Sequence, residues 1–142
     1  MATIKQVLDR KPPEVFSVAP TATVFDALKL MAATNVGALP VIDGERVVGL
    51  FSERDYARKV ILHGKASRET QVREVMHQRI PYMRPSQSVE QAMAVMTEFR
   101  TRHLPVIEDG KLVGIVSIGD VVKEHISEQD FVITQLQKYI NR

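Results

Sequence analysis

The sequence predicts a mixed α/β protein of the α+β type, made of two repeats with the element order β-α-β-β-α. Segment 15–55 aligns without gaps on segment 80–120, and 12 of the 41 aligned positions are identical. Each copy contains a capped helix and then an Asp-Gly turn between two β-branched runs. A repeat of this size is too small to bury a sufficient core alone. We therefore expect the two copies to pack together as a pseudo-twofold pair.

The first elements of each repeat are short and apolar. A lead-in segment and a brief extended stretch are predicted at 4–8 and 15–18 in the first copy, and at 72–76 and 80–83 in the second. A helix then begins at Thr23 and at Ser88, whose hydroxyls can accept an unpaired backbone amide of the first turn. Apolar residues at helical spacing predict the buried faces of these helices: Val24, Ala27, Leu28 and Met31, and then Val89, Ala92, Met93 and Met96.

A β-hairpin follows each helix. The predicted strands are 39–42 and 46–51 around Asp43-Gly44, and 104–107 and 112–116 around Asp109-Gly110. An Asp-Gly pair between apolar β-branched runs is a strong hairpin signal. Because Gly110 lies one aligned position later than Gly44, the pattern favours two different turn types.

A second helix closes each repeat, beginning at Ser52 and at Ser117. The polar stretch 63–71 is predicted to link the repeats, and a last helix is predicted to begin at Ser127. Its expected apolar face comprises Val132, Ile133, Leu136 and Ile140. The resulting divisions are 1–70 for the first repeat with its lead-in and linker, 71–126 for the second repeat, and 127–142 for the C-terminal helix.

Composition restricts the partners. The net charge is only +2 and no Lys/Arg run is present, which argues against a nucleic-acid or membrane surface. The absence of cysteine excludes disulfides, thiolate metal sites and cysteine nucleophiles. The N-terminal residues do not resemble a signal peptide, and no apolar run approaches membrane-spanning length. These observations favour a cytoplasmic protein.

Motifs for catalysis or metal binding were not found in the sequence. The four histidines, His63, His77, His103 and His125, do not have the spacing of a metal site. Neither a P-loop nor a GxGxxG motif is present, and nothing marks an activated nucleophile. We therefore expect a protein that is not an enzyme and that requires neither a metal nor another cofactor.

The Ser-x-x-Asp motif at the end of each hairpin has two interpretations. In the first, Ser52 with Asp55, and Ser117 with Asp120, only cap the helices that follow. In the second, the same helix start provides amides and positive partial charge for a phosphate, while the aspartate accepts the hydroxyls of a ribose. The two roles are compatible, and the motif alone does not choose between them.

The combination of Leu-Pro-Val-Ile, the Asp-Gly hairpin and Gly-x-x-Ser-x-x-Asp, repeated in tandem, resembles a pair of CBS domains, also called a Bateman module. The stretch 51–60, FSERDYARKV, is similar to small stand-alone bacterial members. The resemblance implies two CBS repeats that bind AMP, ADP, ATP, NAD or S-adenosylmethionine in clefts between the domains. It also implies assembly into a homodimer.

The resemblance assigns ligand roles to particular positions. It implies that Asp120 and Ser117 hold the sugar, with the base near Pro81-Tyr82 and Ile115, and with Arg54 or Arg102 on the phosphate. A second, weaker site would use Ser52 and Asp55. The full implied nucleotide-binding set is Gly37, Ala38, Ser52, Arg54, Asp55, Pro81, Tyr82, Arg102, His103, Leu104, Pro105, Ile115, Ser117, Gly119 and Asp120.

The charges of the two copies differ at these positions. Arg102-His103 aligns with Gly37-Ala38, and Arg54 aligns with Gly119. An arginine fork suits phosphate oxygens, although a solvated surface cation is the alternative for both arginines. We expect a non-enzymatic energy or redox sensor that binds an adenosine nucleotide and acts on an unidentified protein target. The alternative is a ligand-free module that mediates homodimer or partner assembly.

Overall fold

The computed structural model describes residues 2–140, which form two compact units. Unit 1 comprises residues 2–14, 81–108 and 113–140, and unit 2 comprises residues 15–80 and 109–112. The lead-in segment of each repeat therefore packs with the other repeat. Residues 1 and 141–142, at the ends of the predicted segments 1–70 and 127–142, lie outside the described residues.

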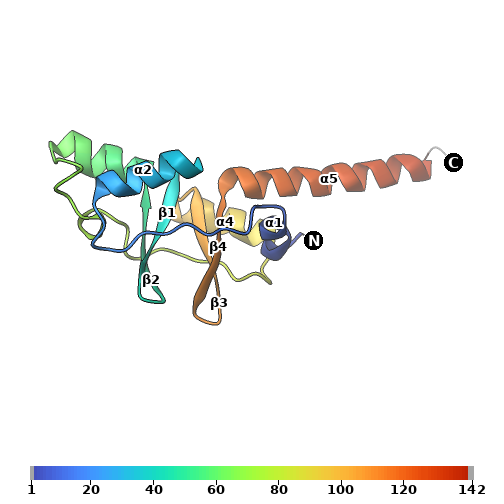
Figure 1. Cartoon of the computed structure of the whole chain (residues 1–142). Helices are drawn as coiled ribbons and strands as arrows, with labels where there is room; N and C mark the ends of the chain where they lie inside the picture. The colour runs from blue at the N-terminus through green and yellow to red at the C-terminus, as the bar shows by residue number, and fades with distance from the viewer. Residues whose placement is uncertain (1, 141–142) are drawn as a thin grey trace. The chain divides into compact units, whose positions relative to one another are not determined.

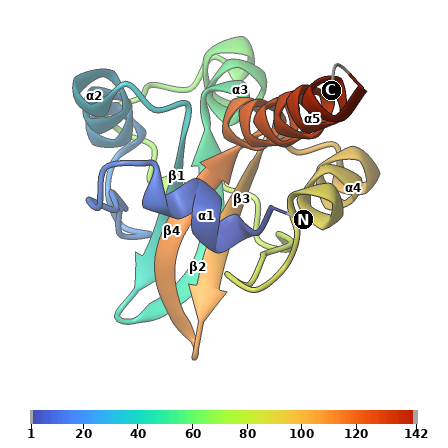
Figure 2. The same ribbon diagram turned by 90° about the vertical axis from the view of Figure 1, so that its right-hand side faces the viewer.

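Unit 2 contains most of the first repeat. Its elements are helix α2 (Val24–Thr34), strands β1 (Ala38–Asp43) and β2 (Arg46–Ser52), the single turn α3 (Glu53–Asp55), the π-helical turn η1 (Tyr56–Val60), and the 3₁₀ turns η2 (Ile61–His63) and η3 (Val72–Glu74) (Figure 1). The two strands pair as an antiparallel hairpin, with Ala38 opposite Ser52 and Asp43 opposite Arg46 (Figure 2). Strand β2 therefore ends at Ser52, immediately before the start of α3.

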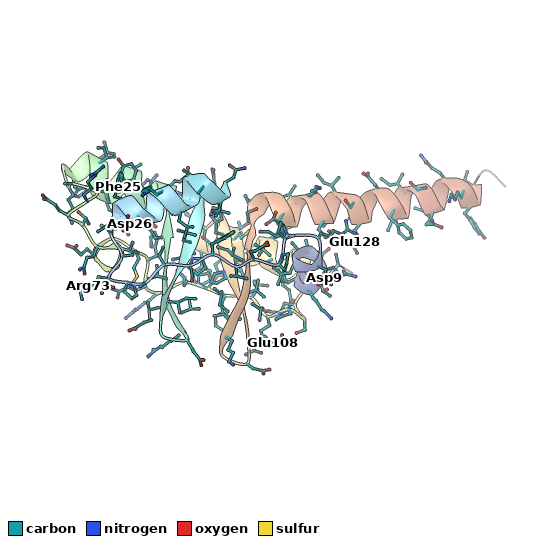
Figure 3. The ribbon with its side chains drawn as sticks, in the orientation of Figure 1. Asp9, Phe25, Asp26, Arg73, Glu108 and Glu128 are labelled. Atoms are coloured by element: carbon teal, nitrogen blue, oxygen red, sulfur yellow. The ribbon has the colours of Figure 1, made fainter. Side chains whose placement is uncertain are left out.

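The core of unit 2 lies between α2 and its hairpin. Its buried residues are Val24, Ala27, Met31, Leu39, Val41, Phe51, Val60, Val72 and Val75. The stretch predicted as a polar linker is ordered against the start of α2, because the carbonyls of Ser67 and Thr70 accept the amides of Phe25 and Val24. Arg68 lies over the ring of Phe25, 4.2 Å from its centroid. Phe25 is labelled on α2 in Figure 3.

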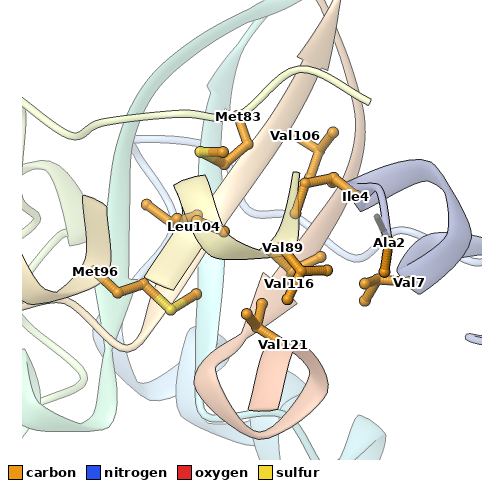
Figure 4. Close-up of a cluster of buried hydrophobic side chains, with 11 residues drawn as sticks. Ala2, Ile4, Val7, Met83, Val89, Met96, Leu104, Val106, Val116 and Val121 are labelled. Atoms are coloured by element: carbon orange, nitrogen blue, oxygen red, sulfur yellow. The ribbon is translucent and has the colours of Figure 1, made fainter. Parts of the chain in front are cut away.

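Unit 1 contains most of the second repeat. Its elements are α1 (Ile4–Asp9), α4 (Val89–Phe99), β3 (His103–Glu108), β4 (Lys111–Ser117, of which residues 113–117 belong to this unit) and α5 (Ile118–Ile140). Their buried side chains form one cluster, which includes Ala2, Ile4, Val7, Met83, Val89, Ala92, Met96, Leu104, Val106, Val116 and Val121 (Figure 4). The apolar stripe predicted for α4 is confirmed, since Val89, Ala92 and Met96 are buried in this cluster.

The leading extended stretch of each repeat is shorter than predicted. Segment 15–18 forms a single parallel bridge, between Val18 and Val41, and segment 80–83 forms one between Met83 and Val106. These stretches therefore lie beside β1 and β3 without forming strands. The α+β class is confirmed, whereas the first β element of each repeat is reduced to one bridge.

The two hairpin turns differ in conformation. In the first turn, of the two loop residues Gly44 and Glu45, only Gly44 has a positive φ, at 65°. In the second, both Asp109 and Gly110 have positive φ, at 52° and 77°. Two consecutive positive φ angles are typical of a type I′ turn, whereas one at the first position is typical of type II′. The predicted difference between the turns is confirmed.

The prediction of a new helix beginning at Ser127 is wrong. Helix α5 continues without a break from Ile118 to Ile140. Residues 120–140 contain neither glycine nor proline, so nothing interrupts helix propagation at the serine. All residues from 129 to 140 are exposed, and this part of α5 projects from its unit (Figure 1). None of the helices within 2–140 combines the length and apolar character needed to cross a bilayer.

Candidate functional site

Each Ser-x-x-Asp motif forms the start of a helix. In unit 1, Ser117 Oγ accepts the Asp120 amide at 3.1 Å, and Asp120 Oδ2 accepts the Ser117 amide at 2.9 Å. In unit 2, Ser52 and Asp55 make the same reciprocal pair, at 3.2 and 2.9 Å. The capping role of both motifs is therefore present. The surroundings of the two aspartates, however, differ.

Asp55 is buried and fully engaged. Its side chain is 3% exposed, and Oδ2 also accepts the Ser52 hydroxyl at 3.0 Å. Its other oxygen, Oδ1, lies 2.9 Å from His77 Nε2 and 3.6 Å from Lys59 Nζ. Both carboxylate oxygens therefore already have partners within unit 2, which leaves Asp55 little capacity for a ligand.

Asp120 is more accessible and has one oxygen available. Its side chain is 27% exposed, and Lys11 Nζ donates to Oδ2 at 2.7 Å. The same ammonium group donates to the Ile115 carbonyl at 2.9 Å, which holds it against β4. Within the described part of the chain, no hydrogen bond reaches Oδ1 of Asp120. The second motif therefore presents an aspartate with a free acceptor beside a lysine.

Each aspartate has a basic side chain beside it from the segment that follows a lead-in turn. Lys11 follows α1, and His77 follows η3. Both segments cross their hairpin at a glycine, because a Cβ on Gly49 would lie 2.7 Å from the His77 carbonyl oxygen and one on Gly114 would lie 2.6 Å from Leu8 Cδ2. These glycines, at aligned positions of the two repeats, permit the close approach.

Two further basic residues lie near the Asp120 site. Arg102 is exposed, and its carbonyl accepts the Ile118 amide at 2.8 Å, so its backbone is fixed at the start of α5. His103 follows it as the first residue of β3 and is half-buried. Lys11 and Arg102 therefore place two basic side chains near Asp120, with the imidazole of His103 beside them.

In unit 2, the residues that align with Arg102 and His103 are the uncharged Gly37 and Ala38. The Gly37 carbonyl accepts the Glu53 amide at 3.1 Å, which repeats the backbone contact of Arg102. Ala38 is buried in β1, and Arg54 is an exposed residue of α3. Gly119, which aligns with Arg54, leaves the first turn of α5 open, since a Cβ there would meet only Ser117 Oγ, at 3.7 Å.

The residues predicted to contact the base belong to unit 1. Tyr82 is 47% exposed and precedes Met83, whose amide donates to the Pro105 carbonyl at 2.9 Å. The segment with Pro81 and Tyr82 therefore runs along β3, on the edge that β4 does not occupy. Leu104 and Pro105 are buried within β3 and support this segment. Ile115 is partly buried on β4, and its carbonyl is the one that holds Lys11.

The protonation of two site residues is shifted from the ordinary values. Burial would raise the pKa of Asp120, but the hydrogen bonds from Lys11 and Ser117 outweigh it, and the pKa of this carboxyl falls below 3.8. Burial, followed by the charge of Lys11, lowers the pKa of His103 below 6.5. At neutral pH, Asp120 is therefore ionised and His103 is predominantly neutral.

Removing the lysine charge with Lys11→Met should lower the free energy of unfolding at pH 7 by about 1 kcal/mol, because Asp120 loses a charge-assisted hydrogen bond at a partly exposed site. Since the Asp120 pKa is lowered in the folded protein, its contribution is complete above pH 3.8 and is lost as the pH falls through the folded value. Urea unfolding of the wild-type protein and of Lys11→Met from pH 2 to 7 measures the two free energies of unfolding. If the difference between them stays constant down to pH 2, the pairing of Lys11 with Asp120 is contradicted.

Three side chains beside the aspartates, Lys11, His77 and Lys59, were not predicted from the sequence. Lys11 lies 109 residues from Asp120, and no local pattern connects them. The alignment of lead-in segments 4–8 and 72–76 would have placed Arg79, not His77, opposite Lys11. The remaining signal was the repeated glycine at 49 and 114, which indicates close contact but does not identify the contacting segment.

Comparison with known proteins gives one consistent family. The family model of the CBS domain matches residues 4–62 and 72–127. A putative signal-transduction protein with CBS domains from Burkholderia ambifaria is 47% identical in structural alignment, with a TM-score of 0.86 over 90% of this chain and 96% of that one. The CBS domain-containing protein YhcV of Bacillus subtilis is 32% identical over 89% of both chains.

Two longer proteins also match. The mitochondrial CBS domain-containing protein CBSX3 of Arabidopsis thaliana is 41% identical over 83% of this chain, which spans 60% of that protein. A hexameric CBS-CP12 protein from bloom-forming cyanobacteria is 27% identical, with a TM-score of 0.76 over 84% of this chain and 66% of that one. The matches thus include small CBS proteins and proteins with additional segments.

Proposed function

Because the chain belongs to the CBS-domain family of regulatory modules, we propose that it is a non-enzymatic sensor of an adenosine-containing nucleotide: AMP, ADP, ATP or NAD. The principal observation is the Asp120 site, where a partly exposed carboxylate with a free oxygen lies at a helix start beside basic residues. The charges and exposed surface of this site suit a ribose phosphate. As a sensor, the protein would respond to cellular energy or redox state.

The sugar is the part of the ligand that Asp120 would recognise. Oδ1 can accept one ribose hydroxyl, and Oδ2 can accept the other if Lys11 turns away. Lys11 is 32% exposed and flexible, so it can release this oxygen and keep its charge nearby. The Ser117 amide already donates a hydrogen bond to Asp120 Oδ2, and this bond would hold the carboxylate in the orientation that accepts both hydroxyls.

The phosphate would lie over the first turn of α5. Gly119 leaves this turn open, and the backbone amides there carry the positive end of the helix dipole. Lys11 and Arg102 would supply full charges, with His103 beside them. The adenine would lie against Tyr82, Pro81 and Ile115, where the exposed tyrosine ring offers a surface for stacking.

The Ser52–Asp55 motif would make a weaker second site at most. Asp55 is buried and both of its oxygens have partners, so a ligand would have to displace His77 or Lys59. Arg54 remains an exposed cation beside this motif and could meet a phosphate. We therefore expect the Asp120 site to have the higher affinity and to bind the first nucleotide of each chain.

Calorimetric titration of the purified protein with AMP, ATP and NAD tests the proposal. We expect saturable binding of at least one of them with a stoichiometry near one per chain. A nucleotide that co-purifies would be identified by mass spectrometry of released small molecules. The proposal fails if none of the three produces binding heat at millimolar concentration from protein shown to contain no bound nucleotide.

An assembly module is the second candidate, favoured by the exposed apolar residues of α5. These are Ile118, Ile126, Phe131, Val132, Ile133, Leu136, Tyr139 and Ile140. Burial of such a surface in a homodimer or against an unidentified protein would be stabilising, and the hexameric CBS-CP12 relative supports assembly. Light scattering after size-exclusion chromatography distinguishes the candidates: a dimer unaffected by nucleotide, without a nucleotide-dependent thermal shift, favours assembly alone.

A further inference from the structure

A group of potential metal ligands lies in unit 1 outside the nucleotide site. Glu90, His125 and Glu128 each offer one ligand atom, and these atoms all lie within 4.8 Å of one another. Glu90 belongs to the first turn of α4, whereas His125 and Glu128 are three residues apart on α5. Residues with this spacing share one face of a helix, so the α5 pair points together toward α4.

Two of the nearby atoms need a partner. Among the described residues, Glu90 Oε2 and His125 Nδ1 are buried atoms that make no hydrogen bond. His125 Nδ1 lies 3.5 Å from Glu90 Oε1, but this contact does not meet hydrogen-bond geometry. Buried polar atoms in proteins normally have partners. A bound cation would supply one partner for both residues.

The spacing suits a small divalent ion. Ligand atoms about 2.0–2.1 Å from a tetrahedral metal are about 3.4 Å apart, close to the separation of His125 Nδ1 and Glu90 Oε1. The side chains of Glu90 and His125 are 41% and 30% exposed, so they have room to adjust and the ion has a route from solvent. Glu128 accepts the Ala2 amide at 3.3 Å, which anchors its carboxylate beside the other two ligands.

We propose that Glu90, His125 and Glu128 bind one first-row divalent cation, for which Zn²⁺ is the best match. One imidazole and two carboxylates are donors that Zn²⁺ accepts, and three protein ligands leave one coordination position for water. The ion would join the start of α4 to the middle of α5 and would stabilise unit 1. No metal motif is visible in the sequence because the ligands come from two helices, and the i, i+3 pair His125–Glu128 is common by chance.

The test uses untagged protein treated with a chelator and then titrated with Zn²⁺, without nucleotide. We expect one Zn²⁺ per chain and a melting temperature about 5–10 °C higher when Zn²⁺ is 100-fold above its Kd. His125→Ala and Glu90→Gln should each weaken binding about 100-fold or more, since even the loss of an outer-shell partner costs 10–100-fold. Replacement of Zn²⁺ by Co²⁺ should give the visible absorption of a four-coordinate Co²⁺ ion.

The matched control is His63→Ala, which removes an exposed histidine of unit 2 and should leave Zn²⁺ binding unchanged. Melting curves in chelator establish that each variant is folded. Wild-type protein that binds no Zn²⁺ would overturn the proposal and would identify the group as an ordinary His–Glu ion pair. Binding that survives in the double variant Glu90→Gln/His125→Ala would also overturn it. Neither result depends on whether the protein binds a nucleotide.

Discussion

Asp120→Asn should weaken AMP binding about 10- to 100-fold, because a hydrogen bond to a charged group contributes about 1.5–3 kcal/mol. The substitution keeps the size of the side chain and one acceptor oxygen, so the start of α5 should be retained. It removes the charge that would hold the ribose hydroxyls. Calorimetry on both proteins measures the loss, provided that wild-type protein binds AMP.

A comparison of two ligands separates the contribution of the ribose hydroxyl to affinity from that of the phosphate. For the wild-type protein, 2′-deoxy-AMP should bind more weakly than AMP, whereas Asp120→Asn should bind both with similar affinity. This comparison is needed because the substitution also frees Lys11, whose charge can strengthen phosphate binding. The control is Asp130→Asn, an exposed residue of the same helix. If Asp120→Asn discriminates the two ligands as well as wild type does, Asp120 does not bind the ribose.

Gly49→Ala should lower the free energy of unfolding by about 2–3 kcal/mol. The added methyl carbon would lie 2.7 Å from the His77 carbonyl oxygen and 2.6 Å from Met76 Sδ. The carbonyl belongs to backbone that exchanges two hydrogen bonds with Leu50, both at 3.0 Å, so it cannot move without breaking them. The substitution should also displace His77 from Asp55. Urea denaturation measures the stability.

Gly114→Ala is the matched control at the aligned position. Its methyl carbon would meet the end of the Leu8 side chain, at 2.6 Å from Cδ2, and a leucine end can rotate away. We therefore expect a loss of about 1 kcal/mol, clearly smaller than that of Gly49→Ala. Equal losses at the two positions would show that the backbone contact at His77 is not what makes Gly49 necessary.

Local signals in the sequence correctly predicted most secondary structure. Thr23 and Ser88 cap α2 and α4 as expected, because a hydroxyl and the amide three residues later are close in any helix start. The chain also turns at the two predicted Asp-Gly sites, at Asp109-Gly110 as expected and one residue later, at Gly44-Glu45, in the first hairpin, because Asp43 pairs with Arg46. The prediction at Ser127 failed because a capping pattern can also lie inside a helix when no residue breaks it.

The candidate site was predicted only in part. Ser117 and Asp120 were found from the repeated motif, and Arg102 and His103 from the family resemblance. The difference between Asp55 and Asp120 in burial and partners was not foreseen. It depends on which residue each lead-in segment places beside the carboxylate, and this is decided by packing between distant parts of the chain.

The sequence by itself therefore determined the duplication, the capped helices, the hairpins and the position of each Ser-x-x-Asp motif. These features depend on periodicity and on hydrogen bonds between residues a few positions apart. Only the tertiary structure decided that Lys11 lies beside Asp120, that His77 and Lys59 lie beside Asp55, and that Glu90 lies near His125. Most of these pairs join separate segments of the chain, and their side chains meet because buried apolar faces fix how those segments pack.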